Sequence, residues 1–253
     1  VQRLDASTTG VGTTVSAEDG SYSCGNIDAG TDVRVRVRAE SQRAGSPNRD
    51  VQVRDNVDTS SHPSPLPKRP LYVTQWALFN TGFAHISGAN YTATTGWGGS
   101  SYTATRAAAP FAILDDIYTG MLLILSEDPS ASFPPLDAYW SVDNTQTRGS
   151  PTNIELGELG GAFSLGDPDN ALFIMGDEGV NTGEFDSYVI LHEWAHYVED
   201  GFSRSDSVAG THYVGGLTEA GVAFGEGAGT GLHAMAYGDT MACHTCAANG
   251  AGR

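Results

Sequence analysis

The sequence has very little lysine and few basic residues of any kind. Lys68 is its single lysine, and 13 basic residues are set against 30 acidic ones, giving a formal net charge of -17. Such a charge repels the phosphate backbone of nucleic acids, so we expect no nucleic-acid partner. The scarcity of lysine, together with abundant glycine, serine, threonine and aspartate, favours a protein that is secreted or held at the cell surface.

The sequence also lacks a long uninterrupted hydrophobic run. Its most apolar stretch, residues 107–125, is interrupted by Pro110 and by the pair Asp115 and Asp116. We therefore expect no membrane-spanning segment. The chain begins at Val1 without a methionine or a signal-like segment, which favours a processed product or a fragment of a longer protein.

Cysteine is scarce as well, with only Cys24, Cys243 and Cys246 present. Cys243 and Cys246 fit either a small disulfide or half of a metal site, but no second cysteine cluster exists to complete such a site. We expect the disulfide, and Cys24 has no evident partner. Hydrophobic residues make up 40% of 253 positions, enough for one large or two small globular domains.

The first sixty residues have the pattern of short strands. Residues 33–38 alternate strictly between valine and arginine, the period of a half-buried strand, and residues 51–54 repeat the alternation. The stretches EDGSYSC (18–24) and DVRVRVRA (32–39) resemble the carboxypeptidase regulatory-like β-sandwich modules found beside secreted enzymes. The resemblance implies a separate β-sandwich module at residues 1–60. Four prolines in residues 62–70 indicate a stiff linker at 61–70, with a second domain at 71–253.

The second domain is expected to combine helices with a sheet, so the fold class is α+β. Apolar residues recur at spacings of three and four over residues 106–126, which predicts a core helix. Short apolar runs at 138–142, 162–165 and 171–175 predict strands. Residues 218–237 are helical in composition but contain five glycines, which suggests close packing against another helix.

One motif with chemical meaning lies in an apolar stretch suited to a helix. Residues 192–196 read HEWAH, so His192 and His196 lie four residues apart and point the same way on a helix. Two imidazoles at this spacing supply half of a tetrahedral zinc site, and Glu193 is placed to reach a nearby water. The plain alternative is two surface histidines. We favour the metal, because the flanking apolar residues would bury the helix and buried imidazoles need partners. Asn181 and Glu184 are expected to form the capping box of this helix.

A zinc site needs a third protein ligand. The metzincin pattern requires glycine at position 199 and histidine at 202, where this chain has Glu199 and Phe202, so that class is excluded. A glutamate from a following helix remains. Glu219 and Glu226 are both candidates, and their spacing does not decide between them.

A family resemblance favours one of these two glutamates. The motif, the preceding stretch NTGEFDSYVIL (181–191) and the stretch AFGEGAGTGLHAMAYGD (223–239) resemble a family of bacterial zincin-like exported proteins. In that family a Glu-Gly pair opens a run of small residues on the second helix, as it does in the aminopeptidase-type gluzincins. The resemblance covers about residues 71–240 and implies a zincin-like domain, with a mixed sheet, in which Glu226 is the third ligand.

The function expected from these residues is zinc-dependent hydrolysis of peptide bonds in a peptide or protein substrate. His192, His196 and Glu226 would hold Zn2+, and Glu193 would act as the general base. The candidate donors to the developing oxyanion, which the sequence does not rank, are His212, Tyr213, His233 and Tyr237.

Two other functions fit parts of the sequence. One is a non-catalytic structural or adhesive surface protein on a zincin-like scaffold, with an extracellular assembly partner. The acidic surface and the β-module would suit it, but a purely structural role gives no reason to keep Glu193. The other is zinc-dependent hydrolysis of a different bond, which a metal site alone does not exclude.

Overall fold

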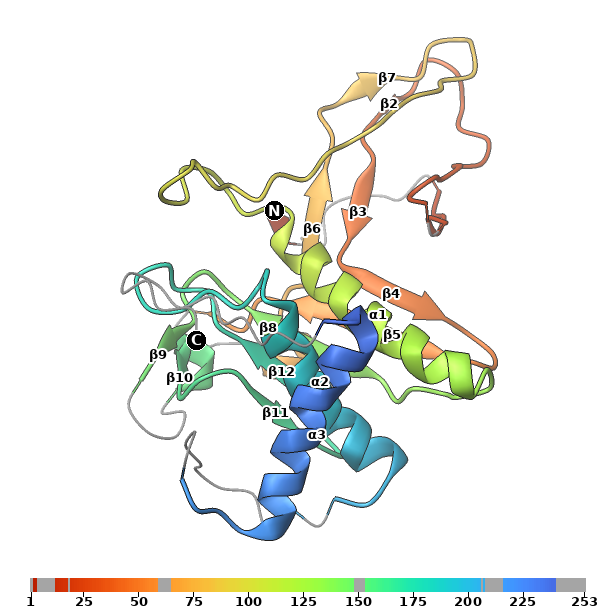
Figure 1. Cartoon of the computed structure of the whole chain (residues 1–253). Helices are drawn as coiled ribbons and strands as arrows, with labels where there is room; N and C mark the ends of the chain where they lie inside the picture. The colour runs from red at the N-terminus through yellow and green to blue at the C-terminus, as the bar shows by residue number, and fades with distance from the viewer. Residues whose placement is uncertain are drawn as a thin grey trace.

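The computed structural model describes residues 2–3, 12–17, 19–58, 65–147, 153–205, 207 and 216–239. Helices and strands alternate irregularly along this part of the chain, so the expected α+β class is confirmed (Figure 1). The helices are α1 (Ala109–Glu127), α2 (Ser187–Phe202) and α3 (Ala220–Tyr237), with 3-10 turns η1 (Leu66–Lys68) and η2 (Ile154–Leu156). The strands are β1 (Gln2–Arg3), β2 (Asp32–Val33), β3 (Arg36–Arg38), β4 (Glu40–Arg43), β5 (Arg49–Arg54), β6 (Tyr72–Gln75), β7 (Phe79–Asn80), β8 (Leu136–Trp140), β9 (Thr145–Gln146), β10 (Glu158–Leu159), β11 (Phe163–Leu165) and β12 (Ala171–Ile174).

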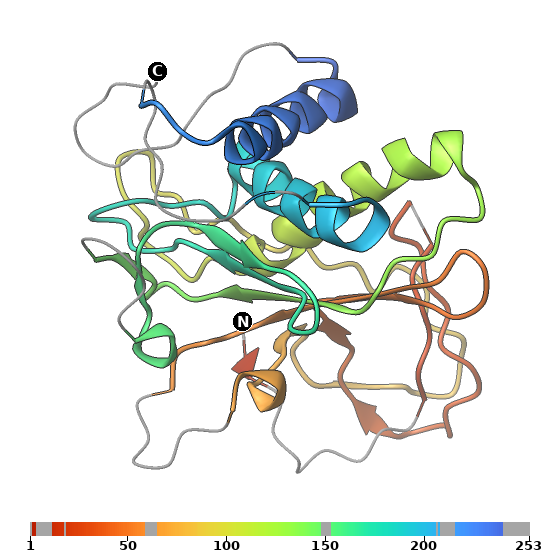
Figure 2. The same ribbon diagram turned by 90° about the horizontal axis from the view of Figure 1, so that it is seen from below.

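A mixed sheet of five strands forms the centre of the molecule, in the order β11-β12-β8-β5-β4. Strands β5, β8 and β12 run parallel, and β4 and β11 are antiparallel edge strands. All three helices lie on one face of this sheet (Figure 2). The strands predicted at 138–142, 162–165 and 171–175 correspond to β8, β11 and β12.

The expected division into a module at residues 1–60 and a domain at 71–253 is not what the structure shows. Strand β5 from the first segment pairs with β8 from the second, from Val51 opposite Leu136 to Arg54 opposite Tyr139. Strand β3 likewise pairs with β6 across the proline-rich stretch. Two-residue alternation identifies a half-buried strand but does not say which sheet it joins. The local sequence pattern therefore suggested a domain boundary at the proline-rich stretch, but strands from both sides of that stretch pair with each other.

The proline-rich stretch is also not a free connector where the structure describes it. Within the expected linker at 61–70, residues 66–68 form η1 and the guanidinium of Arg69 is fully buried. Arg69 Nη1 lies 3.0 Å from Asp58 Oδ2, and Nη2 lies 3.5 Å from Glu155 Oε1. This part of the stretch is thus fixed to the body by charge pairs.

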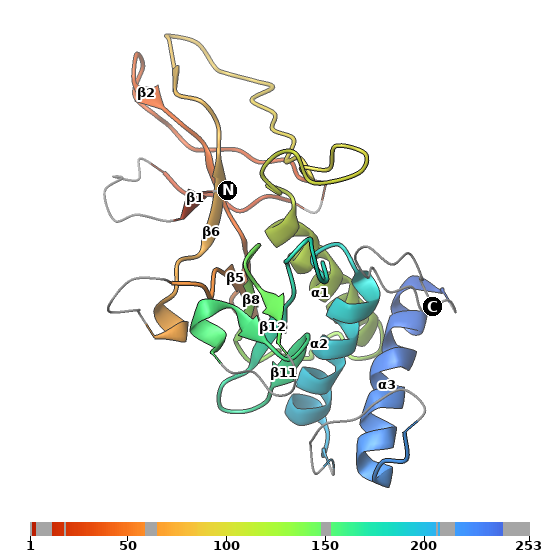
Figure 3. The same cartoon turned by 90° about the vertical axis from the view of Figure 1, so that its left-hand side faces the viewer.

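A smaller β-rich part projects from the body and contains residues from both sides of that stretch. It comprises the sheet β1-β6-β3 and the ribbon β2-β7, which extends farthest from the helices (Figures 1 and 3). The alternating run at residues 33–38 does not form one strand, because it divides between β2 and β3. Cys24, which precedes β2 in the chain, is exposed and free. The disulfide expected between Cys243 and Cys246 concerns residues outside the described part of the chain.

The main core lies between the sheet and helices α1 and α2. Alternate residues of β8 and β12 face the helices, and the others contribute to a second, smaller cluster on the opposite face. Strand β12 is buried along its whole length, which explains its continuous apolar run. The largest buried side chains of the main cluster are Trp140, Trp194, Tyr197, Phe133, Ile113, Ile117 and Met121.

Helix α1 confirms the core helix expected at 106–126. By length and composition α1 could also cross a membrane. Pro110 and the aspartate pair therefore do not exclude a membrane span, contrary to the expectation from the sequence. In this structure its apolar residues have another explanation. Ala109, Ile113 and Ile117 are at most 1% exposed and pack in the main core.

Candidate metal centre

Helix α2 places the two motif histidines on the side that faces α3. Its opposite side is anchored in the core by Ile190, Leu191, Trp194 and Tyr197. The helix begins at Ser187, and its N-cap is Asp186, whose side chain accepts a hydrogen bond from Val189 N at 3.2 Å. The capping box expected from Asn181 and Glu184 is therefore wrong. Glu184 is instead buried and accepts a hydrogen bond from Arg106 Nη1 at 2.7 Å.

Helix α3 approaches α2 closely because two of its glycines face α2 side chains. A Cβ atom on Gly229 would lie 2.8 Å from His192 Nδ1, and one on Gly225 would lie 2.9 Å from Glu199 Oε2. A larger residue at 229 would clash with the His192 ring, and one at 225 would displace the Glu199 carboxylate. The expected role of glycine in helix packing is thus confirmed for these two positions, whereas Gly227 and Gly231 have open space around them.

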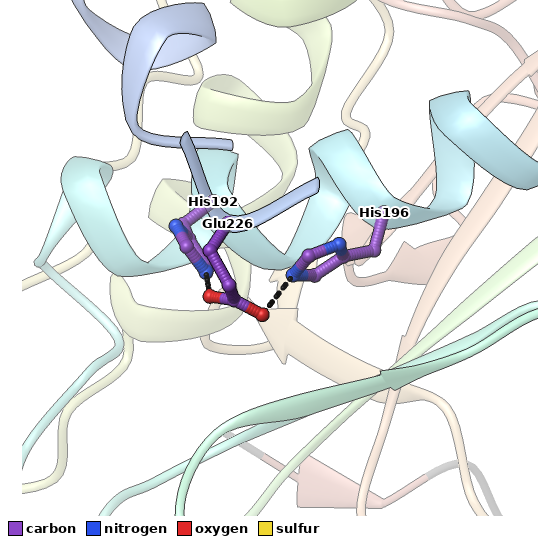
Figure 4. A group of neighbouring side chains, drawn as sticks. All are labelled: His192, His196 and Glu226. Atoms are coloured by element: carbon purple, nitrogen blue, oxygen red, sulfur yellow. Dashed lines mark hydrogen bonds and ion pairs between the residues drawn. The ribbon is translucent and has the colours of Figure 1, made fainter. Parts of the chain in front are cut away.

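The close approach brings His192, His196 and Glu226 together (Figure 4). His192 Nε2 lies 2.9 Å from Glu226 Oε2, within hydrogen-bond distance, and His196 Nε2 lies 3.5 Å from Glu226 Oε1. One candidate ligand atom from each residue lies within 4.8 Å of the other two. The three side chains are 16–25% exposed, so the group is open to solvent on one side.

This donor set fits a metal ion. Two atoms bound at about 2.0–2.1 Å to a tetrahedral centre are about 3.3 Å apart. The Glu226 carboxylate approaches that separation from each imidazole through a different oxygen, at 2.9 Å for Oε2 and 3.5 Å for Oε1, and the set of one donor atom per residue lies within 4.8 Å. Both histidines present the same nitrogen, Nε2, to the same small space. The residues present therefore fit one cation held by two nitrogens and a carboxylate.

The charges of the group also favour a cation. Burial opposes ionisation of Glu226, but hydrogen bonds and charge from His192 and His196 outweigh burial and hold its pKa well below the usual range. The hydrogen bond with Glu226 raises the pKa of His196 against the effect of burial, and the carboxylates of Glu193 and Glu199 add to the rise. Three carboxylates around two imidazoles make a site with surplus negative charge.

Glu219 and Glu226, the two candidates for the third ligand, have different positions in the structure. Glu226 lies inside the group of converging side chains. Glu219 is the N-cap of α3, where its side chain accepts hydrogen bonds from Gly221 N at 2.7 Å and Val222 N at 3.4 Å. Glu219 thus caps a helix and is not among the converging side chains.

The candidate oxyanion donors on α3 are engaged elsewhere. His233 is buried with Nε2 3.4 Å from Ser187 Oγ, and the Tyr237 hydroxyl donates to Asp116 Oδ1. Their rings pack against each other at 5.5 Å between centroids. Among the described contacts, neither residue touches the histidine–glutamate group. His212 and Tyr213 lie outside the described residues.

Sequence reasoning missed three residues beside the group. Tyr188 lies one turn before His192 on α2, and its hydroxyl lies 3.0 Å from Thr230 Oγ1, one turn after Glu226 on α3. Glu199 lies three residues after His196, with Oε2 3.9 Å from His196 Nδ1. Their spacing of three or four residues from a candidate ligand places them on the same face of each helix, and that signal was available in the sequence.

Comparison of the chain with protein-family models, with curated proteins and with solved structures gave no match.

Proposed function

We propose that this chain binds one zinc ion at His192, His196 and Glu226 and hydrolyses peptide bonds. The observation that carries the proposal is the convergence of two Nε2 atoms and a carboxylate from two helices within 4.8 Å. Catalytic zinc sites use three protein ligands of these types and leave a further position for water or substrate. On this proposal the ligand set is of the gluzincin type and the scaffold is zincin-like.

The zinc ion and Glu193 would have different roles in the proposed hydrolysis. When bound, zinc supplies Lewis-acid chemistry that activates water near neutral pH. Glu193, beside the first ligand on α2, accepts the proton of the attacking water and delivers it to the leaving amine. The partial exposure of His192, His196 and Glu226 supports access for an extended substrate. The net charge of -17 and the single lysine support an extracellular or cell-surface location within this proposal.

Elemental analysis of the purified protein tests the metal. Wild type and Glu193→Gln should each hold about one zinc per chain, whereas His196→Ala should lose it because two ligands hold zinc far less tightly than three. His85→Ala, on an exposed loop outside the group, is the matched histidine control and should keep its zinc. Equal zinc content in His196→Ala and wild type would contradict the site.

The same experiment separates the two glutamates. Glu226→Ala should abolish zinc binding. Glu219→Ala should leave zinc affinity within a few-fold of wild type and should cost about 1 kcal/mol of folding stability through the lost cap. A titration in which Glu219→Ala alone loses zinc would contradict the ligand assignment.

Cleavage of a peptide library tests the reaction. Wild type should cleave, and Glu193→Gln should lose at least 100-fold in rate while keeping its zinc, because it lacks a proton acceptor. Zinc-loaded wild type that cleaves no peptide would instead favour a structural or adhesive role, or hydrolysis of another bond. Unchanged cleavage by Glu193→Gln would contradict the role of Glu193 as base.

A further inference from the structure

The two motif histidines have different surroundings on the side away from Glu226. The Nδ1 atom of His192 is buried, faces Gly229, and has no hydrogen-bond partner in the described part of the chain. The Nδ1 atom of His196 instead faces the Glu199 carboxylate at 3.9 Å. The candidate ligands are thus not equivalent, although they belong to one motif.

Glu199 occupies space that α3 leaves open. Its side chain is only 11% exposed, and its Oε2 atom lies where a Cβ atom on Gly225 would approach to 2.9 Å. The carboxylate is therefore enclosed between α2 and α3, one helical turn from His196. Because residue 225 is glycine, α3 leaves free the space that the carboxylate occupies, and the carboxylate forms with His196 an ion pair that is longer than a hydrogen bond.

The burial of the Glu199 carboxylate implies that it has a stabilising partner. An ionised side chain removed from water destabilises the fold unless a partner offsets the lost hydration. Among the described residues, His196 is the basic side chain that forms an ion pair with Glu199. A carboxylate behind a ligand imidazole accepts its free N–H, fixes the orientation of the ring and makes the other nitrogen a stronger donor.

We propose that Glu199 is a positioning residue that holds His196 through Nδ1, so that Nε2 is directed at the metal. This inference rests on the proposed zinc site. It assigns His196 as the strongly held ligand and His192 as the weakly held one. Glu199 acts through His196 and touches neither metal nor substrate.

Zinc affinity, measured by competition with a chromophoric chelator, tests the proposal without any activity assay. Glu199→Ala should bind zinc 10–100-fold more weakly than wild type. Glu199→Gln keeps an oxygen that accepts the Nδ1 proton but lacks charge, so it should restore part of the loss. Gly225→Ala should weaken binding with Glu199 still present, because the added methyl group displaces its carboxylate. The absorption spectrum of the cobalt-substituted protein should shift in Glu199→Ala, because the His196 ring is free to turn.

Asp200→Asn is the matched control, since it removes the same charge from the exposed neighbouring position on α2. It should leave zinc affinity and the cobalt spectrum unchanged. Wild-type affinity and spectrum in Glu199→Ala would overturn the proposal, and so would an equal loss in Asp200→Asn. A wild-type chain that takes up no zinc would overturn the metal site and this inference together. Glu199→Gln has nearly the same shape as the native residue, so it keeps the test decisive if Glu199→Ala fails to fold.

Discussion

At the residue scale, Asp116 is a carboxyl group buried between α1 and α3. Its side chain accepts a hydrogen bond from the Tyr237 hydroxyl, and the residue is 8% exposed. Burial raises the pKa of Asp116 from 3.8 to about 6, against the effect of the Tyr237 hydrogen bond, and Asp115 and Asp186 add to the rise. The folded protein therefore holds this proton at pH values where the unfolded chain has released it.

Asp116 should make the protein less stable as pH rises towards and through 6. The stability that Asp116 contributes is fully present below about pH 3.8, its pKa in the unfolded chain, and is lost as the pH rises through its folded pKa of about 6. Between pH 5 and 7.5, the free energy of unfolding of Asp116→Asn relative to wild type should increase by about 1–2 kcal/mol. Urea denaturation at both pH values measures this. An equal increase in Asp115→Asn, at the exposed neighbouring position, would contradict the assignment to Asp116.

The three residues of the candidate metal site could be proposed from the sequence, because the signal of the two histidines is local and a family resemblance suggested the glutamate. The spacing of His192 and His196 on one helix follows from the sequence alone, whereas the choice of Glu226 over Glu219 did not follow from spacing. The structure supplies the missing reason, since the glycines of α3 set which turn of that helix meets α2. Glu199 was read only as a departure from the metzincin pattern. Its contact with His196 follows from their spacing of three residues on α2, whereas its enclosure beside Gly225 depends on how α3 packs.

At the element scale, α1 and α2 meet at a glycine. A Cβ atom on Gly120 would lie 2.5 Å from Trp194 Cζ3 and 2.9 Å from Leu191 Cδ2, and both side chains are fully buried. Helix α1 can pack at this distance only because residue 120 has no side chain. The sequence marked this helix by its apolar period, but nothing in that period identifies the contact point.

Gly120→Ala should therefore lower the free energy of unfolding by about 1–2 kcal/mol. The overpacking cost of up to about 3 kcal/mol exceeds the gain of about 1 kcal/mol in helix propensity. Gly231→Ala is the matched control, since a Cβ atom there meets nothing within 4 Å, and it should raise stability by about 0.5–1 kcal/mol. Urea denaturation compares the two variants. A stabilised Gly120→Ala protein would contradict the packing described for α1 and α2.

At the scale of the whole molecule, the central sheet depends on the N-terminal residues. Strand β5 lies between β8 and β4, and its residues Val51 and Val53 are buried in the main core. A chain of residues 65–253 should therefore lose β4 and β5 from the central sheet, expose the edge of β8 and show no cooperative thermal transition. Circular dichroism and calorimetry test this. A soluble fragment with a sharp transition would restore the separate module that the sequence suggested.

The three helices and the strands β5, β8, β11 and β12 could be predicted from local pattern, and the class α+β follows from them. The continuous apolar run of β12 and the apolar period of α1 indicate these elements without any tertiary information. The order of strands could not be predicted, because pairing between β5 and β8 joins residues far apart in the sequence. The proline-rich stretch was misleading for the same reason, since its composition gives no sign that Arg69 is buried beside Asp58 and Glu155.

The parallel pairing of β5 with β8 also sets an order of events during folding. Parallel neighbours cannot join through a tight turn, so β5 has no partner on that side until the chain has been made as far as Trp140. Contacts between such distant segments form slowly, because the intervening loop must first close. Until then β5 and β4 form only a two-stranded hairpin, which is barely stable in water. The nascent chain therefore keeps an open strand edge on β5 from the time Arg54 is made until Trp140 is made, and that edge is where mispairing with another chain would begin.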